Sequence, residues 1–162
     1  MKLRLATIDD AEALRTIYNR EVLETTHTFD LEPRSLEAQQ EWIREREGAF
    51  GVVVAEIDTE VAGFASLSPY RPRAAYRTSV ENSVYVAESA RGAGVGRALM
   101  DELIDVATSR GFHTIMARVV GGHDASIGLH QSCGFQVVGT EREVGRKFGR
   151  WLDVVVMQRM LA

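Results

Sequence analysis

The sequence predicts one α/β domain of the α+β type that spans residues 1–162, and three observations support it. Strand-like and helix-like periodicities follow one another in the order β-α-α-β-β-β-α-β-α-β-β. A strand, a glycine-rich loop and a helix adjoin near the middle of the chain. The length suits a single hydrophobic core, and 45% hydrophobic with 26% charged residues is typical of a globular protein.

Helix caps and alternating residues define the elements of the N-terminal half. Thr7 and Ser35 each precede a helical pattern, and both residue types cap helices by accepting backbone hydrogen bonds. The acidic residues that follow Thr7 are favoured there by the helix dipole. The predicted elements are a strand over 2–6, a helix beginning at 7, a second helix from 35 to about 47, and a hairpin of strands over 51–57 and 61–67.

The C-terminal half alternates strands with helices. Gly111 and Gly134 end its two helices, because glycine readily adopts the left-handed conformation that follows a helix. The predicted elements are a strand over 78–86, a helix over 95–110, a strand over 114–120, a short helix over 125–132, and two antiparallel strands over 135–144 and 152–160.

Composition excludes several classes of function. The net charge of -4 argues against a general nucleic-acid-binding surface. The single cysteine, Cys133, offers neither an internal disulfide nor a zinc cluster, and we expect no metal. No apolar stretch is long enough to span a membrane, so we expect no membrane partner and a location in the reducing cytoplasm.

The loop over residues 91–98 has the sequence R-G-A-G-V-G-R-A and opens a helix. Its glycines and the free N–H groups of the helix start suit a pyrophosphate, although a purely structural turn is the alternative. A dinucleotide-binding loop would need a further glycine at Arg97 or Leu99, and the G-K-[ST] ending of a P-loop is missing. The remaining pattern, R-x-x-G-x-G, resembles the acetyl-CoA signature of the GCN5-related N-acetyltransferases (GNAT).

The resemblance covers the whole chain, because the element order is that of the GNAT fold. It implies a central mixed, mostly antiparallel twisted sheet that is flanked by helices. Three segments resemble the phosphinothricin and methionine sulfoximine N-acetyltransferases: 80–86 (VENSVYV), 125–135 (ASIGLHQSCGF) and 144–153 (VGRKFGRWLD). This family acetylates the α-amine of small amino acids such as L-phosphinothricin, methionine sulfoximine or methionine sulfone, and it is typically homodimeric with sites near the subunit interface.

Two residues depart from the family pattern. Asn82 stands where the family often has histidine, and Asp124 stands where it usually has an asparagine that contacts the cofactor. A carboxylate close to the phosphates would repel them, whereas Asp124 can also accept hydrogen bonds from the cofactor amides. The departure leaves the role of Asp124 open.

The resemblance implies that backbone N–H groups over 92–98, with Arg91 and Arg97, hold the pyrophosphate; a solvated arginine is the alternative for Arg97. The pantetheine arm is expected to pair with the preceding strand as an added strand, and the N–H of Val86 to face the acetyl carbonyl oxygen. The expected cofactor-binding residues are Val84, Tyr85, Val86, Arg91, Gly92, Ala93, Gly94, Val95, Gly96, Arg97, Ala98, Asp124 and His130.

Attack of an amine on a thioester needs a base and a proton for the leaving thiolate. Glu81, on the strand face of Ser83 and opposite Asn82, is the expected base, directly or through water, because burial raises a carboxyl pKa. A structural pair with an arginine is the alternative. His130 stands where the family commonly has a proton-donating tyrosine, and a histidine that only orients the cofactor is the alternative. His27, His113 and His123 are expected at the surface or in loops.

Residues 70–77 place three arginines and two tyrosines beside the catalytic strand. Arginine suits bidentate recognition of carboxylate or phosphinate, although a solvated basic loop is the alternative. The expected acceptor-binding residues are Arg73 first, Arg71 second, Thr78, Glu81 and Phe29, while Lys147, Phe148 and Trp151 complete either the pocket or a dimer contact.

Other functions remain open at this point. A GNAT enzyme can act on protein N-termini or on polyamines, and the basic loop argues against a polyamine site. A non-catalytic acyl-CoA-binding sensor is a further alternative, against which the presence of both Glu81 and His130 argues.

Overall fold

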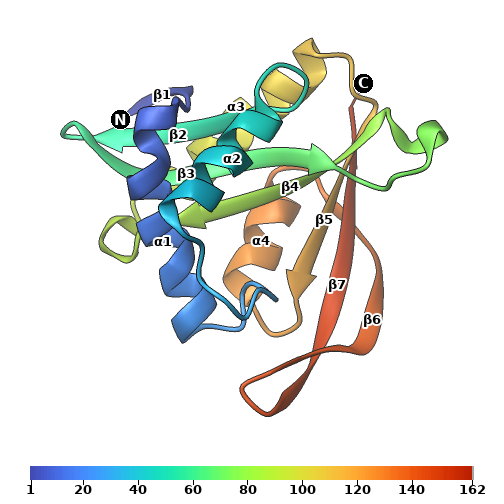
Figure 1. The fold of residues 1–162 in the computed structure, drawn as a ribbon. Helices are drawn as coiled ribbons and strands as arrows, with labels where there is room; N and C mark the ends of the chain where they lie inside the picture. The colour runs from blue at the N-terminus through green and yellow to red at the C-terminus, as the bar shows by residue number, and fades with distance from the viewer. Residues whose placement is uncertain (162) are drawn as a thin grey trace.

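The computed structural model describes residues 1–161 and contains a seven-stranded sheet in the order β1-β2-β3-β4-β5-β7-β6 (Figure 1). Helices and strands follow the predicted order. Their bounds are β1 (Lys2–Leu5), α1 (Ala11–Glu24), α2 (Leu36–Arg46), β2 (Val52–Ile57), β3 (Glu60–Pro69), β4 (Ser79–Val86), α3 (Val95–Ser109), β5 (Thr114–Val120), α4 (Asp124–Ser132), β6 (Gln136–Lys147) and β7 (Arg150–Met160). Short 3-10 helices lie at η1 (Ile8–Asp10), η2 (Ala74–Tyr76) and η3 (Glu88–Ala90).

Strand pairing confirms a mixed, mostly antiparallel sheet. The β4–β5 pair is parallel, and the other pairs of neighbouring strands are antiparallel. Within residues 1–161, no helix combines the length and the apolar character needed to cross a membrane.

Both predicted caps stand at the start of a helix, Thr7 before η1 and Ser35 before α2. Ser35 caps α2 as predicted, because its Oγ accepts a hydrogen bond from the Ala38 N–H at 3.1 Å. At the other cap, the Thr7 N–H donates to the Asp10 carboxylate at 2.7 Å, and Arg4 holds that carboxylate through two nitrogens at 2.8 Å. The chain therefore enters α1 through η1, fixed by a carboxylate.

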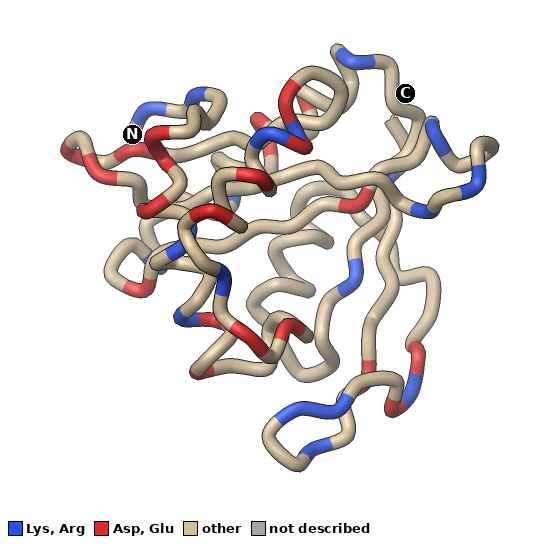
Figure 2. Tube along the Cα trace, in the orientation of Figure 1, with Lys and Arg blue, Asp and Glu red and all other residues tan. Residues whose placement is uncertain are grey.

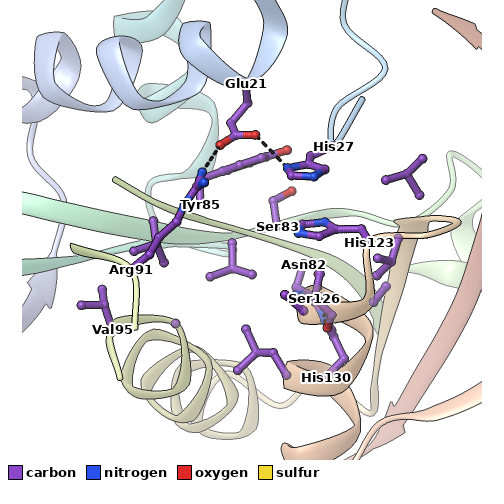
Figure 3. A pocket seen from close by; sticks show the side chains of 18 of the residues that line it. Glu21, His27, Asn82, Ser83, Tyr85, Arg91, Val95, His123, Ser126 and His130 are labelled. Carbon is purple, nitrogen blue, oxygen red and sulfur yellow. Dashed lines mark hydrogen bonds and ion pairs between the residues drawn. The ribbon is translucent and has the colours of Figure 1, made fainter. Parts of the chain in front are cut away.

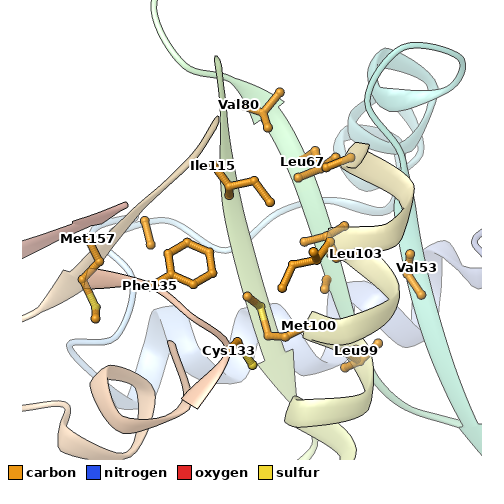
Figure 4. Close-up of a cluster of buried hydrophobic side chains, with 14 of the residues drawn as sticks. Val53, Leu67, Val80, Leu99, Met100, Leu103, Ile115, Cys133, Phe135 and Met157 are labelled. Carbon is orange, nitrogen blue, oxygen red and sulfur yellow. The ribbon is translucent and has the colours of Figure 1, made fainter. Parts of the chain in front are cut away.

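The sheet buries a different core on each face. Alternation along β2 sends Val53 toward α3 and Val54 toward α1 and α2, which cover the opposite face (Figure 1). Leu99 and Leu103 of α3 are fully buried in the larger cluster, which Figure 4 shows. Phe64 of β3 is fully buried in the cluster beneath α1 and α2. Both faces of the central strands are therefore covered.

Strands β4 and β5 diverge along their length. Their register pairs 79–81 with 114–116, whereas β4 stays paired to β3 through Val86 and β5 stays paired to β7 through Val120. The edge of β4 that faces β5 therefore lacks a ladder partner beyond Glu81. Helix α4 lies beside this gap (Figure 1).

The β6–β7 hairpin extends away from the body of the sheet, and β6 forms its edge (Figure 1). It holds the connection between α1 and α2: a Cβ built on Gly145 would lie 2.4 Å from the Phe29 ring, and buried Lys147 donates to the Thr28 carbonyl oxygen at 2.9 Å. The apolar side chains that the hairpin exposes are those of Val137, Val138, Val144, Phe148, Trp151 and Met160.

Candidate active site

A cavity of about 540 Å³ occupies the gap between β4 and β5 (Figure 3). Its walls come from the end of α1, residues 82–86 of β4, the glycine loop, β5 and the start of α4. The predicted cofactor-binding residues that line it are Val84, Tyr85, Val86, Arg91, Gly92, Gly94, Val95, Gly96 and His130.

The glycine loop presents unpaired amides to this cavity. Gly92 and Gly94 both have φ near +80°, a conformation that glycine adopts without strain, and Gly94 is the residue before α3. The first N–H groups of a helix have no acceptor within it. Ala98 differs from the prediction, because its N–H donates to the Gly94 carbonyl oxygen at 3.1 Å. The open amides therefore end at Arg97, and they fit the diphosphate of a cofactor.

Four expected cofactor residues do not line the cavity: Ala93, Arg97, Ala98 and Asp124. Arg97 is exposed and donates from Nε to Asp101 at 3.1 Å, which agrees with the alternative of a solvated arginine. Asp124 is exposed as the first residue of α4, whereas the preceding His123 lines the cavity.

Glu81 is half-buried near the middle of β4. As predicted, Asn82 and Val80 point to the α3 side, where both are buried, so Glu81 and Ser83 take the opposite face. Burial raises the pKa of the Glu81 carboxyl, and the charges of Arg118 and Arg71 offset part of that rise. A carboxylate with a raised pKa is suited to accept a proton near neutral pH.

Both ring nitrogens of buried His130 are engaged. Nδ1 lies 2.7 Å from the Ser126 carbonyl oxygen, and Nε2 lies 3.0 Å from Nδ2 of Asn82. Because the carbonyl only accepts, Nδ1 carries the proton and Nε2 accepts from the Asn82 amide. Burial lowers the pKa of His130, which keeps the ring neutral. This geometry favours a histidine that fixes its neighbours over one that donates a proton.

Two further histidines, His27 and His123, lie in loops as predicted, but they also line the cavity, where sequence reasoning gave them no role. The rings of His27 and His123 stack with centroids 3.6 Å apart and planes within 3°. His27 Nδ1 lies 3.0 Å from Glu21, whose other carboxylate oxygen accepts from Arg91 at 2.7 Å (Figure 3). The Glu21–Arg91 contact joins residues 70 positions apart, so local sequence patterns carry no signal of it.

The arginine-bearing loop lies at the opposite end of β4 from the glycine loop, and it is rich in basic residues (Figure 2). The Arg71 guanidinium lies 4.8 Å from the Tyr70 ring centroid. Arg73 is exposed immediately before η2, and Thr78 is exposed immediately before β4. None of the described lining residues of the cavity comes from this loop, and Phe29 is also outside it.

The buried histidines predict a stability that falls as pH decreases below 7. Burial, and after it the positive charge of a protonated His27, lowers the pKa of His123 to about 4. Burial also lowers the pKa of His130. Between about pH 6.5 and 4 the unfolded chain binds more protons at His123 than the folded chain does, so the free energy of unfolding decreases as pH falls, with a limiting slope of about 1.4 kcal/mol per pH unit. The lowered pKa of His130 adds a decrease of the same sign. Glu81, whose pKa is raised, acts in the opposite direction.

Denaturant titrations at pH 7 and pH 5 measure this change. The variant His123→Gln is expected to lose less stability over the interval than the natural chain, and His113→Gln, at an exposed position, serves as the control. An equal loss in the natural chain and in His123→Gln would show that His123 does not titrate in this way.

Comparison with known proteins places this geometry in a family. A family model described as an acetyltransferase (GNAT) domain matches residues 3–156. The L-methionine sulfoximine/L-methionine sulfone acetyltransferase of Pseudomonas paraeruginosa is 40% identical over 158 residues, which cover 96% of this chain and 92% of the relative.

Two solved structures share the fold over nearly the whole chain. A GNAT superfamily phosphinothricin acetyltransferase from Sinorhizobium meliloti, in complex with acetyl-CoA, has a TM-score of 0.96 and 37% identity, covering 99% of this chain and 88% of that one. A ribosomal-protein-alanine N-acetyltransferase from Brucella melitensis has a TM-score of 0.97 and 44% identity, covering 99% and 100%. The family prediction is confirmed: this chain belongs to the GNAT family of acetyl-CoA-dependent acetyltransferases.

Proposed function

We propose that this enzyme transfers the acetyl group of acetyl-CoA to the α-amine of a small amino acid or analogue of the L-phosphinothricin, methionine sulfoximine or methionine sulfone type. The observation that carries the proposal is the position of Glu81. This half-buried carboxylate lies on β4 between a cavity with open amides at one end and a loop of arginines at the other. The names of the methionine sulfoximine/methionine sulfone and phosphinothricin relatives support the acceptor class.

The open amides before and within the first turn of α3, together with Arg91, would hold the diphosphate. The unpaired edge of β4 over 82–86 would take the pantetheine arm as an added strand. Acetyl-CoA supplies an acetyl group activated as a thioester. The N–H of Val86 would donate to the carbonyl oxygen of that group, where negative charge develops during attack.

Glu81 would accept the proton of the incoming ammonium, directly or through water, so that the amine attacks in its neutral form. His130 holds Asn82 against the cavity through the bond from the Asn82 amide. We assign His130 this positioning role in place of proton donation, because its Nδ1 proton is directed at the Ser126 carbonyl oxygen.

Arg73, with Arg71 beside it, would bind the acidic groups of the acceptor, because guanidinium pairs with carboxylate or phosphinate through two parallel hydrogen bonds. The influence of Arg71 on the Glu81 pKa supports a position near the base. Thr78 and Phe29 would add a polar and an apolar contact.

The chain would act as a homodimer in the cytoplasm. The edge strand β6 and the exposed apolar side chains of its hairpin support a subunit contact there, because such surfaces are usually covered. The free, buried Cys133 agrees with a reducing compartment. Sedimentation equilibrium measures the oligomeric state directly.

Thiol release from acetyl-CoA tests the proposed function against a panel of acceptors. The panel contains L-phosphinothricin, methionine sulfoximine, methionine sulfone, the common amino acids, a polyamine and an N-terminal peptide. Saturable release with one of the first three supports the proposal. Release with the peptide alone would assign a protein N-terminus as the acceptor, and tight cofactor binding without any release would indicate a sensor.

The variant Glu81→Gln is expected to lower kcat by at least about 100-fold, because the amide keeps the shape of the side chain but accepts no proton. Steady-state kinetics with the best acceptor measure the effect, and calorimetry confirms that acetyl-CoA still binds. Glu60→Gln, at the exposed start of β3, is the matched control. A near-normal kcat for Glu81→Gln would refute the base assignment.

Arg73→Ala is expected to raise KM for the amino acid by about tenfold or more while KM for acetyl-CoA stays unchanged, because the loss removes charge-assisted hydrogen bonds to the acceptor. Arg77→Ala, from the same exposed loop, is the control. Equal increases in both KM values would show that Arg73 supports the fold of the site instead.

A further inference from the structure

Glu21 is a buried carboxylate that the proposed chemistry does not use. It lies near the end of α1, and its side chain is only 5% exposed. Arg91 Nη2 donates to Oε1 at 2.7 Å, while Thr25 Oγ1 donates to Oε2 at 2.8 Å and His27 Nδ1 lies 3.0 Å from the same oxygen. A buried carboxylate is costly unless it is paired in this way, so its position is fixed.

The partners of Glu21 come from separate walls of the cofactor cavity. Arg91 belongs to the glycine loop, and His27 belongs to the connection after α1. His27 in turn stacks on His123, which precedes α4 (Figure 3). One carboxylate and one ring stack therefore link three segments around the cavity.

We propose that Glu21 is a positioning residue for acetyl-CoA, which fixes Arg91 at the diphosphate and sets the His27–His123 stack as a cavity wall. The inference rests on the proposed placement of the diphosphate at the glycine loop. Arginine has donors on three nitrogens, so Arg91 keeps Nε and Nη1 for phosphate oxygens while Nη2 stays on Glu21. The ion pair also offsets the charge of Glu21, which would otherwise repel an anionic cofactor.

The alternative, in which Glu21 competes with the diphosphate for Arg91, predicts the opposite change in affinity for acetyl-CoA. If Glu21 competed with the diphosphate for Arg91, its removal would free the guanidinium and tighten cofactor binding. If Glu21 fixes Arg91 in a productive geometry, its removal weakens binding, because a mobile arginine must be ordered each time the cofactor binds. The sign of the change in affinity therefore separates the two roles.

Calorimetric titration of the full chain with acetyl-CoA, without any acceptor, is the test. Glu21→Gln is expected to raise the Kd for acetyl-CoA about tenfold, because it removes a charge-assisted hydrogen bond, while KM for the acceptor stays unchanged. Glu24→Gln, which removes an exposed carboxylate from the same helix, is the control and should leave Kd unchanged. An unchanged or lower Kd for Glu21→Gln would overturn the proposal.

A double-mutant cycle distinguishes positioning from general support of the fold. In an Arg91→Gln background, Glu21→Gln is expected to cause little further loss of affinity, because the residue through which Glu21 acts is already absent. Independent, additive losses would contradict the proposal. If Glu21→Gln does not fold, Glu21→Asp keeps the charge but withdraws it from Arg91, and a raised Kd is again expected and an unchanged one would overturn the proposal.

The design separates this inference from the proposed acceptor. Failure of every acceptor in the turnover panel leaves the cofactor titration intact, because that titration needs no acceptor. Failure of the Glu21 variants to change Kd leaves the acceptor chemistry at Glu81 untouched. Arg91→Gln alone must weaken acetyl-CoA binding, and an unchanged Kd for that variant would refute the placement of the diphosphate itself.

Discussion

The divergence of β4 from β5 is the constraint on which the site depends. The two strands pair over three residues and then part, each held by its other neighbour. The gap leaves unpaired backbone groups along β4 and makes room for the cavity, which the glycine loop closes at one end. A buried strand edge needs a partner, and an extended, amide-bearing ligand supplies one. The proposed binding site therefore exists because the edge of β4 beyond Glu81 has no neighbouring strand to pair with.

Burial acts on the titratable groups around this gap in one common direction. It raises the pKa of Glu81 and lowers those of His123 and His130, so each group is shifted toward its neutral form. Such surroundings favour the neutral form of an amine over its ammonium form. The raised pKa of Glu81 makes its carboxylate a better acceptor for the proton that the ammonium loses. Arg118 of β5 lines the cavity, and further arginines lie beyond the two ends of β4, in the loop over 70–77 and at Arg91, where anionic groups of the two substrates would bind.

Features that depend on local sequence were predictable. Periodicity and caps gave the element order, and strand alternation placed Glu81 opposite Asn82, as the structure confirms. The Glu21–Arg91 pair and the His27–His123 stack were not predictable, because they join segments that meet only after the sheet has assembled. The glycine signature identified the loop but did not show which of its side chains face the cavity. Arg97, expected to hold the pyrophosphate, is instead paired with Asp101.

Amide hydrogen exchange with and without acetyl-CoA tests the role of the strand gap most directly. Binding is predicted to slow exchange of the alternate amides in residues 82–86 that face β5, and of the loop amides from Gly92 through Arg97, because these amides lack acceptors. The already bonded Ala98 amide should change little. Cofactor binding that left both segments unprotected while slowing exchange elsewhere would contradict the placement of the cofactor between the diverging strands.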